Sequence, residues 1–141
     1  MEPTNKKVSL LRIVAATIYD SLLMLGVWFL VGSLALSIKF VFTGEVSSLN
    51  PIAGMGLVIL STWLYFALFW IYGGKTLGMS SWKLRIISQN GNQITIIQTI
   101  IRFFSNILTI SLAGIPFFFR QINKNNKSLS DLLSKTSIIS D

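Results

Sequence analysis

The feature that most constrains this chain is a pair of long apolar segments joined by a short polar connection. The first covers about residues 10–38 and the second about residues 51–72. A helix needs about 20 apolar residues to cross the hydrocarbon core of a bilayer, and both segments reach that length. The second segment starts with Asn50 and Pro51, a typical N-cap followed by proline at the first helical position. The sequence therefore predicts two membrane-spanning helices.

The composition agrees with a lipid environment. Of the 141 residues, 52% are hydrophobic and only 12% are charged. A soluble domain devotes about a quarter of its residues to charged side chains. A soluble chain of this size would also have too small an interior to bury so much apolar surface. We expect a single membrane domain over residues 1–141, with the bilayer itself as a partner.

The net charge of +7 does not indicate a nucleic-acid partner. The basic residues stand in short clusters beside the apolar segments, without a long basic face or a nucleic-acid-binding signature. Such clusters suit anionic lipid headgroups and the charge asymmetry that orients spanning helices. We therefore expect no nucleic acid to bind.

The absence of Cys and His from the sequence excludes several kinds of chemistry. Thiol nucleophiles, imidazole bases and the usual zinc ligands are all missing. The five acidic residues are spread along the chain and form no nucleophile–base pair or metal-binding pattern. We expect no enzymatic activity, no cofactor and no metal site.

A small β-hairpin is predicted at about residues 82–95, outside the bilayer. Asn90-Gly91 is the strongest short hairpin signal, because both residues tolerate the positive φ of a type I′ turn. The strand positions around this turn are taken by apolar residues, namely Leu84, Ile86 and Ile94.

A third hydrophobic segment at about residues 94–119 is broken by Gly114 and Pro116. Its most apolar part, residues 103–119, gives about 25 Å of helix, which is barely enough to span a bilayer. The segment is therefore either a short span or a re-entrant hairpin. Irregular backbone at that depth must be covered by protein or water.

Charge asymmetry predicts the orientation in the cytoplasmic membrane. Basic residues precede the first spanning segment and follow the second, whereas the loop between them is nearly neutral. Both basic ends should therefore be cytoplasmic. The tail at residues 120–141 is also basic, and only the re-entrant alternative returns it to the cytoplasm. We favour that alternative, with cytoplasmic N- and C-termini and a tail strand (KTSII) added to the hairpin.

Asp20 is the residue that most requires an explanation, since it lies inside the first spanning segment. A charged Asp near the centre of a spanning helix costs about 2.5–3.5 kcal/mol, so it should find a partner or bind a proton. Arg12 lies eight residues away, about 12 Å along a helix. Arg102 is therefore the predicted partner of Asp20; the alternative is that Asp20 reaches interfacial water or caps neighbouring backbone. Arg12 either marks the cytoplasmic end of its helix or is a partner of Asp131.

Three blocks of sequence resemble the RDD family of small integral membrane proteins. Arg12 and Ala15 precede a displaced Asp20, GGKTLGMSSWKLRIISQNG begins at Gly73, and SLSDLLSKTSII carries Asp131. Arg102 opens the last hydrophobic segment between the second and third blocks. The resemblance covers about residues 10–139 and implies that Arg12, Asp20 and Asp131 are signature positions. Ser130 departs from the pattern, because relatives often have His before the second aspartate.

The resemblance implies transport of small ions or solutes, with cation/proton exchange as one form. In this hypothesis Asp20 binds the ion or proton, Arg102 is its countercharge, and Arg12 with Asp131 forms a cytoplasmic gate. Two or three helices can hardly enclose a pathway, so a homo-oligomer or partner membrane subunits are expected. The alternative is a non-transporting scaffold or accessory subunit whose buried charges specify helix assembly.

Overall fold

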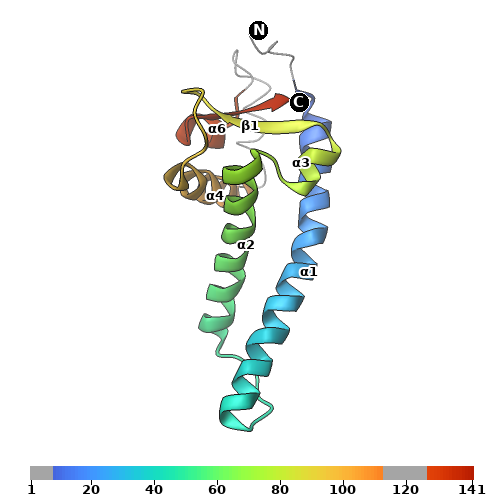
Figure 1. Cartoon of the computed structure of the whole chain (residues 1–141), viewed down its shortest axis with the longest axis vertical. Coiled ribbons are helices and arrows are strands. Elements are labelled where there is room, and N and C mark those ends of the chain that lie inside the picture. The colour runs from blue at the N-terminus through green and yellow to red at the C-terminus, as the bar shows by residue number, and fades with distance from the viewer. Residues whose placement is uncertain (1–7, 113–126) are drawn as a thin grey trace.

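The computed structural model describes residues 8–112 and 127–141. Two long helices, α1 (Leu10–Thr43) and α2 (Pro51–Gly73), run side by side in opposite directions along the long axis of the molecule (Figure 1). Both are long and apolar enough to cross a membrane. They correspond to the two predicted spanning segments, although α1 continues beyond residue 38 to Thr43. We call this helix pair the stalk.

Local chemistry explains where the stalk helices end. Gly44 ends α1 in the left-handed conformation, with φ of 69°, and its N–H donates to the carbonyl of Phe40. The side chain of Asn50 accepts a hydrogen bond of 2.9 Å from the N–H of Ile52, which confirms the predicted N-cap. Gly74 then ends α2 with φ of 66°. Glycine adopts this conformation without the steric cost that a Cβ would add.

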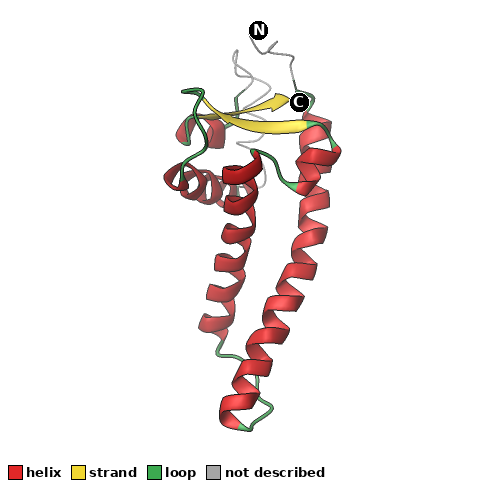
Figure 2. Ribbon diagram, viewed as in Figure 1, coloured by secondary structure: helices red, strands yellow, loops and turns green. Residues whose placement is uncertain are grey.

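The remaining elements gather at one end of the stalk and form what we call the head (Figure 2). Around the start of α1 and the end of α2 lie α3 (Leu77–Ser81), β1 (Leu84–Ser88), α4 (Ile96–Ser111), α6 (Leu129–Leu133) and β2 (Thr136–Ser140). The fold is thus mostly helical with one small sheet, as the sequence predicts in outline.

The sheet pairs β1 with β2 in antiparallel register, from Leu84 opposite Ser140 to Ser88 opposite Thr136. The predicted tail strand is therefore present, but the predicted hairpin at residues 82–95 is wrong. A capping box at the start of α4 explains the difference. The backbone N–H of Thr95 donates to the side-chain oxygen of Gln98, and the backbone N–H of Gln98 donates to the hydroxyl of Thr95. The chain thus turns into a helix where the second strand was expected.

The hydrophobic core lies at the junction of stalk and head. Leu84 and Ile86 of β1 are 0% and 2% exposed, and they pack against separate groups of residues. Leu84 packs with the beginning of α1, whereas Ile86 packs with Trp70 near the end of α2. Strand β1 therefore joins the head to both stalk helices.

The third hydrophobic segment forms α4, which lies across the end of α2 at the base of the head (Figure 1). The expected break at Gly114 and Pro116, and the basic residues Arg120 and Lys124, lie outside the described residues. The described part of the segment is thus a continuous helix over Ile96–Ser111.

Candidate functional site

One buried polar site lies where α1 contacts α3. Arg12, Ala16 and Asp20 are spaced four residues apart, which places them on one side of α1. Ala16 and Asp20 are only 2% and 3% exposed. A Cβ built on Gly78 of α3 would lie 2.3 Å from the carbonyl oxygen of Ala16. The two helices can therefore approach this closely only because residue 78 is glycine.

Asp20 accepts three hydrogen bonds at this contact. The hydroxyl of Thr76 donates to Oδ2 over 2.5 Å, while the N–H of Gly78 donates to Oδ1 over 2.9 Å. The Tyr65 hydroxyl, from α2, donates to Oδ1 over 3.3 Å. Thr76 is also the N-cap of α3, since its hydroxyl accepts from the N–H of Met79. The carboxylate thus completes the N-terminal end of a short helix that belongs to another part of the chain.

All three donors to Asp20 are neutral groups. Asp20 forms no salt bridge within residues 8–112 and 127–141. The predicted pair between Asp20 and Arg102 is therefore wrong. The physical reason is that α3 lies against α1 and supplies N–H and O–H groups to the carboxylate, while Arg102 on α4 bonds elsewhere.

Arg12 holds the opposite end of α3. Its Nε donates to the carbonyl of Trp82 over 3.1 Å, and its Nη2 donates to the carbonyls of Trp82 and Lys83. Nη1 lies 3.4 Å from the hydroxyl of Ser140 on β2. Carbonyls at a helix C-terminus lack partners inside the helix, and a guanidinium satisfies several at once. The predicted pairing of Arg12 with Asp131 is wrong, because the α3–β1 turn takes these donors.

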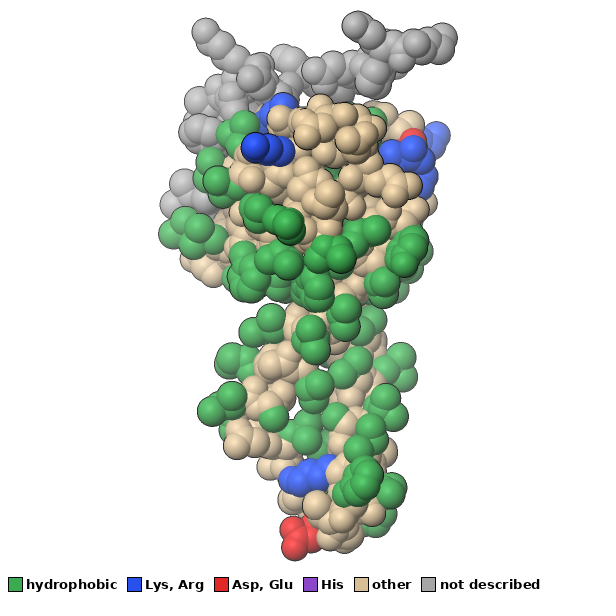
Figure 3. Space-filling view, turned by 60° about the vertical axis from the view of Figure 1, so that its left-hand side comes forward, with side chains coloured by type: hydrophobic (Ala, Val, Ile, Leu, Met, Phe, Trp, Pro, Cys, Tyr) green, Lys and Arg blue, Asp and Glu red, His purple; other side chains and the backbone are tan. Residues whose placement is uncertain are grey.

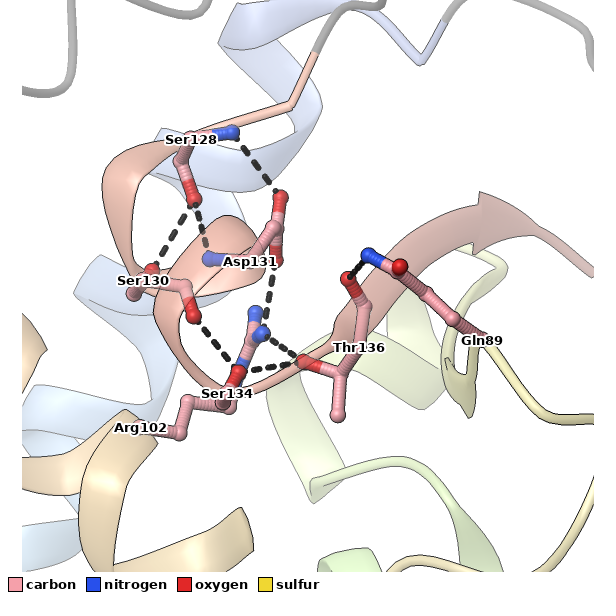
Figure 4. A network of polar contacts seen from close by, with 7 residues as sticks. All are labelled: Gln89, Arg102, Ser128, Ser130, Asp131, Ser134 and Thr136. Carbon is pink, nitrogen blue, oxygen red and sulfur yellow. Dashed lines mark hydrogen bonds and ion pairs between the residues drawn. The ribbon is translucent and has the colours of Figure 1, made fainter.

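A second buried site joins α4 to α6 and β2 (Figure 4). Nη1 of Arg102 lies 2.6 Å from Oδ1 of Asp131, and the two side chains are 3% and 1% exposed. The same nitrogen donates to the hydroxyl of Thr136 over 2.6 Å. The guanidinium carbon also lies 5.6 Å from the ring centre of Trp70, within the range of a cation–π interaction. Asp131 thus has a charged partner, whereas the described partners of Asp20 are neutral.

Hydroxyl groups complete this second site. Ser128 and Asp131 form a capping box at the start of α6, in which each side chain accepts from the other residue's N–H. The hydroxyl of Ser134 lies 2.7 Å from that of Thr136 and donates to the carbonyl of Ser130. The hydroxyl of Ser130 lies 2.9 Å from that of Ser128, so Ser130 also belongs to this network of short side chains.

An exposed ion pair lies at the end of β2. The ammonium of Lys75 donates to Asp141 over 2.6 Å, and Nε of Arg85 lies 3.5 Å from the other carboxylate oxygen. The hydrogen bond from Lys75 lowers the pKa of the Asp141 carboxyl, and the charge of Arg85 adds to this effect. This contact ties the tail to the turn that follows α2.

The four predicted charged residues thus divide between two sites. Arg12 and Asp20 hold α3, whereas Arg102 and Asp131 form an ion pair elsewhere in the head. Sequence reasoning did not identify four residues that complete these sites, namely Tyr65, Thr76, Gly78 and Thr136. Thr76 and Gly78 lie within the sequence block that begins at Gly73, but their contacts with Asp20 depend on the tertiary fold.

The described ranges contain no group of three or more His, Cys, Asp or Glu residues that could hold a metal ion. The chemistry available at the first site is that of one carboxylate surrounded by two hydroxyls and one amide. Such oxygen-rich groups suit a proton or a hard cation.

Comparison of the chain with known proteins identifies its family but no individual relative. No curated protein and no solved structure shows significant similarity to this chain. The sequence model of the RDD family matches residues 9–135, a range that includes Arg12, Asp20, Arg102 and Asp131. RDD is a membrane-associated family, which agrees with the two apolar helices of the stalk. The chain is therefore a membrane protein that belongs to the RDD family.

Proposed function

We propose that this protein moves protons or small cations across a membrane, with Asp20 as the group that binds them. One observation carries the proposal. Asp20 is 3% exposed in a long apolar helix, yet within the described residues its three partners are all neutral. Among residues 8–112 and 127–141, no basic group forms a salt bridge with its negative charge.

A buried charge of this kind is costly. Moving an ionised carboxylate out of water without a counter-ion costs several kcal/mol, which hydrogen bonds to the carboxylate offset in part. A bound proton or cation removes that cost. The hydroxyls of Tyr65 and Thr76 add neutral oxygens beside the carboxylate, so a small hard cation would find several ligands in one place.

The proposed orientation places the head in the cytoplasm, with both chain termini on that side of the cell membrane. The described part of the head carries several basic residues, whereas the opposite end of the stalk carries Lys39 and Glu45, whose charges cancel. This asymmetry follows the positive-inside rule. A reporter fused after Asp141 tests the orientation, and a periplasmic signal would contradict it.

Transport by this chain requires an assembly. The stalk contains two helices, and large apolar side chains point outward along its length, among them Phe29 at 74% exposed and Ile52 at 82%. Two helices cannot surround a polar path. We therefore propose a homo-oligomer, or an assembly with partner membrane subunits, in which the exposed faces pack together.

A second function is favoured by a different observation. Arg12 and Asp20 bind opposite ends of α3, so both residues have a structural role in fixing the head on α1. In a non-transporting scaffold or accessory subunit this role would be sufficient. The two functions differ in whether the charge of Asp20 is needed or only its hydrogen-bond acceptors.

The decisive experiment measures fluxes of Na⁺, K⁺ and H⁺ in liposomes that contain the purified protein. Asp20→Asn removes the charge but keeps an oxygen that accepts from the N–H of Gly78. Glu45→Gln is the matched control, since it removes an exposed acidic charge from the loop at the far end of the stalk. Transport predicts flux for the wild type and Glu45→Gln, and at least about a tenfold loss in Asp20→Asn.

Equal flux in Asp20→Asn and wild type would contradict the role of Asp20. Absence of flux in all three proteins, with Asp20→Asn folded and assembled like the wild type, would support the scaffold. Folding of each variant is checked by circular dichroism and gel filtration in detergent.

A further inference from the structure

We propose that α4 lies in the plane of the bilayer surface, with its outer face immersed at the boundary between headgroups and acyl chains. The observation behind this proposal is the inverted polarity of the helix. Most of its large apolar residues point away from the protein, whereas Thr99 and Arg102 are buried against the head. The proposal concerns α4 alone and does not depend on whether the protein transports ions.

The outer face of α4 is almost entirely apolar. Ile97, Phe104 and Leu108 are 69%, 59% and 58% exposed. At about 100° per residue, the exposed positions fall within one arc of about 160°. The other large apolar residues in this arc, including the position just after the helix, are Ile96, Ile100, Ile101, Ile107 and Leu112.

The inner face of α4 carries the polar groups. Thr99 and Arg102 are 0% and 2% exposed, and Phe103 is the apolar residue buried with them. Arg102 binds Asp131, while the side-chain amide of Gln98 donates to Ser88 of β1. A surface helix in water has the opposite arrangement, with its apolar stripe toward the core. The solvent outside α4 is therefore expected to be apolar.

The position of α4 identifies this apolar surrounding as lipid. The helix lies across the axis of the stalk, at the level where the stalk meets the head (Figure 1). Hydrophobic side chains cover the lower part of the head and continue along the stalk, while Lys and Arg side chains of the head lie farther from the stalk (Figure 3). The outer face of α4 is thus continuous with the surface that the stalk presents to a membrane.

A helix lying in the plane of the bilayer surface matches this geometry better than a helix whose outer face is covered by another protein. Amphipathic helices at membrane surfaces bury their apolar side about 5–10 Å into the headgroup and acyl boundary. The polar face of an amphipathic helix in a water-soluble protein contacts water. The polar face of α4 contacts the head instead. The Arg102–Asp131 pair would hold the head against the bilayer.

This placement differs from the short span and from the re-entrant hairpin that the sequence suggests for residues 94–119. The difference is measurable as depth. Ile97 and Leu108 are separated by about 16 Å along the helix axis. A helix along the membrane normal would place them at very different depths, whereas an in-plane helix places them at the same depth.

The absence of native Cys makes a depth measurement direct. Single-cysteine variants at Ile97, Phe104 and Leu108 are spin-labelled and reconstituted in vesicles of phosphatidylcholine and phosphatidylglycerol. Accessibility to oxygen and to a water-soluble nickel complex gives the depth of each label. Leu64 in the middle of α2 provides a deep reference, and Val46, which is 94% exposed in the loop after α1, provides an aqueous reference.

We expect the three labels on α4 to show one shallow depth, between those of the two references and equal within about 5 Å. A depth that increases steadily from Ile97 to Leu108 would overturn the proposal in favour of insertion. Accessibility to the nickel complex equal to that of Val46 would overturn it in favour of water. Low accessibility to both reagents, with immobilised spectra, would overturn it in favour of a second copy or another protein covering the face.

Discussion

Asp20 and Asp131 are the same side chain in two different electrostatic environments. They are equally inaccessible, at 3% and 1% exposed. Asp131 lies 2.6 Å from the guanidinium of Arg102, so its charge is balanced inside the head. Asp20 is surrounded by hydroxyls and one amide, all of them neutral. Burial is therefore not what distinguishes these two carboxylates.

The comparison separates two uses of a buried acid. At Asp131 the ion pair fixes the relative position of α4 and α6, which is a structural task. At Asp20 the hydrogen bonds fix α3 against α1, and the charge itself has no structural partner in the described fold. We infer that the charge of Asp131 is needed for stability, whereas the charge of Asp20 is available for binding.

The largest predicted effect comes from breaking the balanced pair. Arg102→Met removes the guanidinium that lies beside the buried carboxylate of Asp131 and should lower the free energy of unfolding by about 3–5 kcal/mol. Thermal unfolding in detergent, followed by circular dichroism, measures this loss. The double variant Arg102→Met with Asp131→Leu should recover much of the loss, because both charges are then absent. A single variant as stable as the wild type would mean that the pair does not hold α4.

A smaller effect is expected at the contact that brings α3 to Asp20. Gly78→Ala places a methyl group 2.3 Å from the backbone of Ala16, which cannot move away without displacing α3. The expected loss is about 1–3 kcal/mol by the same unfolding assay. Gly56→Ala is the matched control, because nothing lies within 4 Å of its added Cβ. It should be neutral or slightly stabilising in α2. Equal losses in both variants would contradict the close α1–α3 contact.

The smallest effect is expected at the exposed pair between Lys75 and Asp141. Because Lys75 lowers the pKa of Asp141, the pair stabilises the fold above about pH 4, the ordinary range of an aspartate. That contribution is lost as the pH falls through the lowered pKa. It should amount to about 0–1 kcal/mol, since Asp141 is 33% exposed. Unfolding of wild type and Asp141→Asn should differ at neutral pH and converge in acid. A difference that persists in acid would contradict this assignment.

The sequence predicted those features that depend on local chemistry. The stalk helices follow from two uninterrupted apolar segments, and the Asn50 cap follows from a residue next to Pro51. The hairpin prediction is wrong because the chain turns at Gly91, which has positive φ, and the Thr95–Gln98 capping box then begins α4 in place of a second strand. Two local signals conflicted, and the helix signal prevailed.

The partners of the buried charges could not be predicted in the same way. Asp20 and Gly78 are 58 residues apart, and their contact depends on how α3 folds back on α1. The sequence indicated that Asp20 needed a partner, and an arginine was the obvious choice by charge. Hydrogen bonds from a short helix could not be predicted from residue types, because the backbone N–H of almost any residue can donate them.

The most direct test of the contrast between the two carboxylates is the unfolding free energy of Asp20→Asn beside that of Asp131→Asn. Each variant removes one charge and retains a side chain of nearly the same shape. We predict that Asp20→Asn changes stability by less than about 1 kcal/mol or increases it, while Asp131→Asn loses about 3–5 kcal/mol. Equal destabilisation by both variants would show that the charge of Asp20 contributes as much to stability as that of Asp131, and would contradict the assignment of Asp20 as a carboxylate whose charge is free to bind.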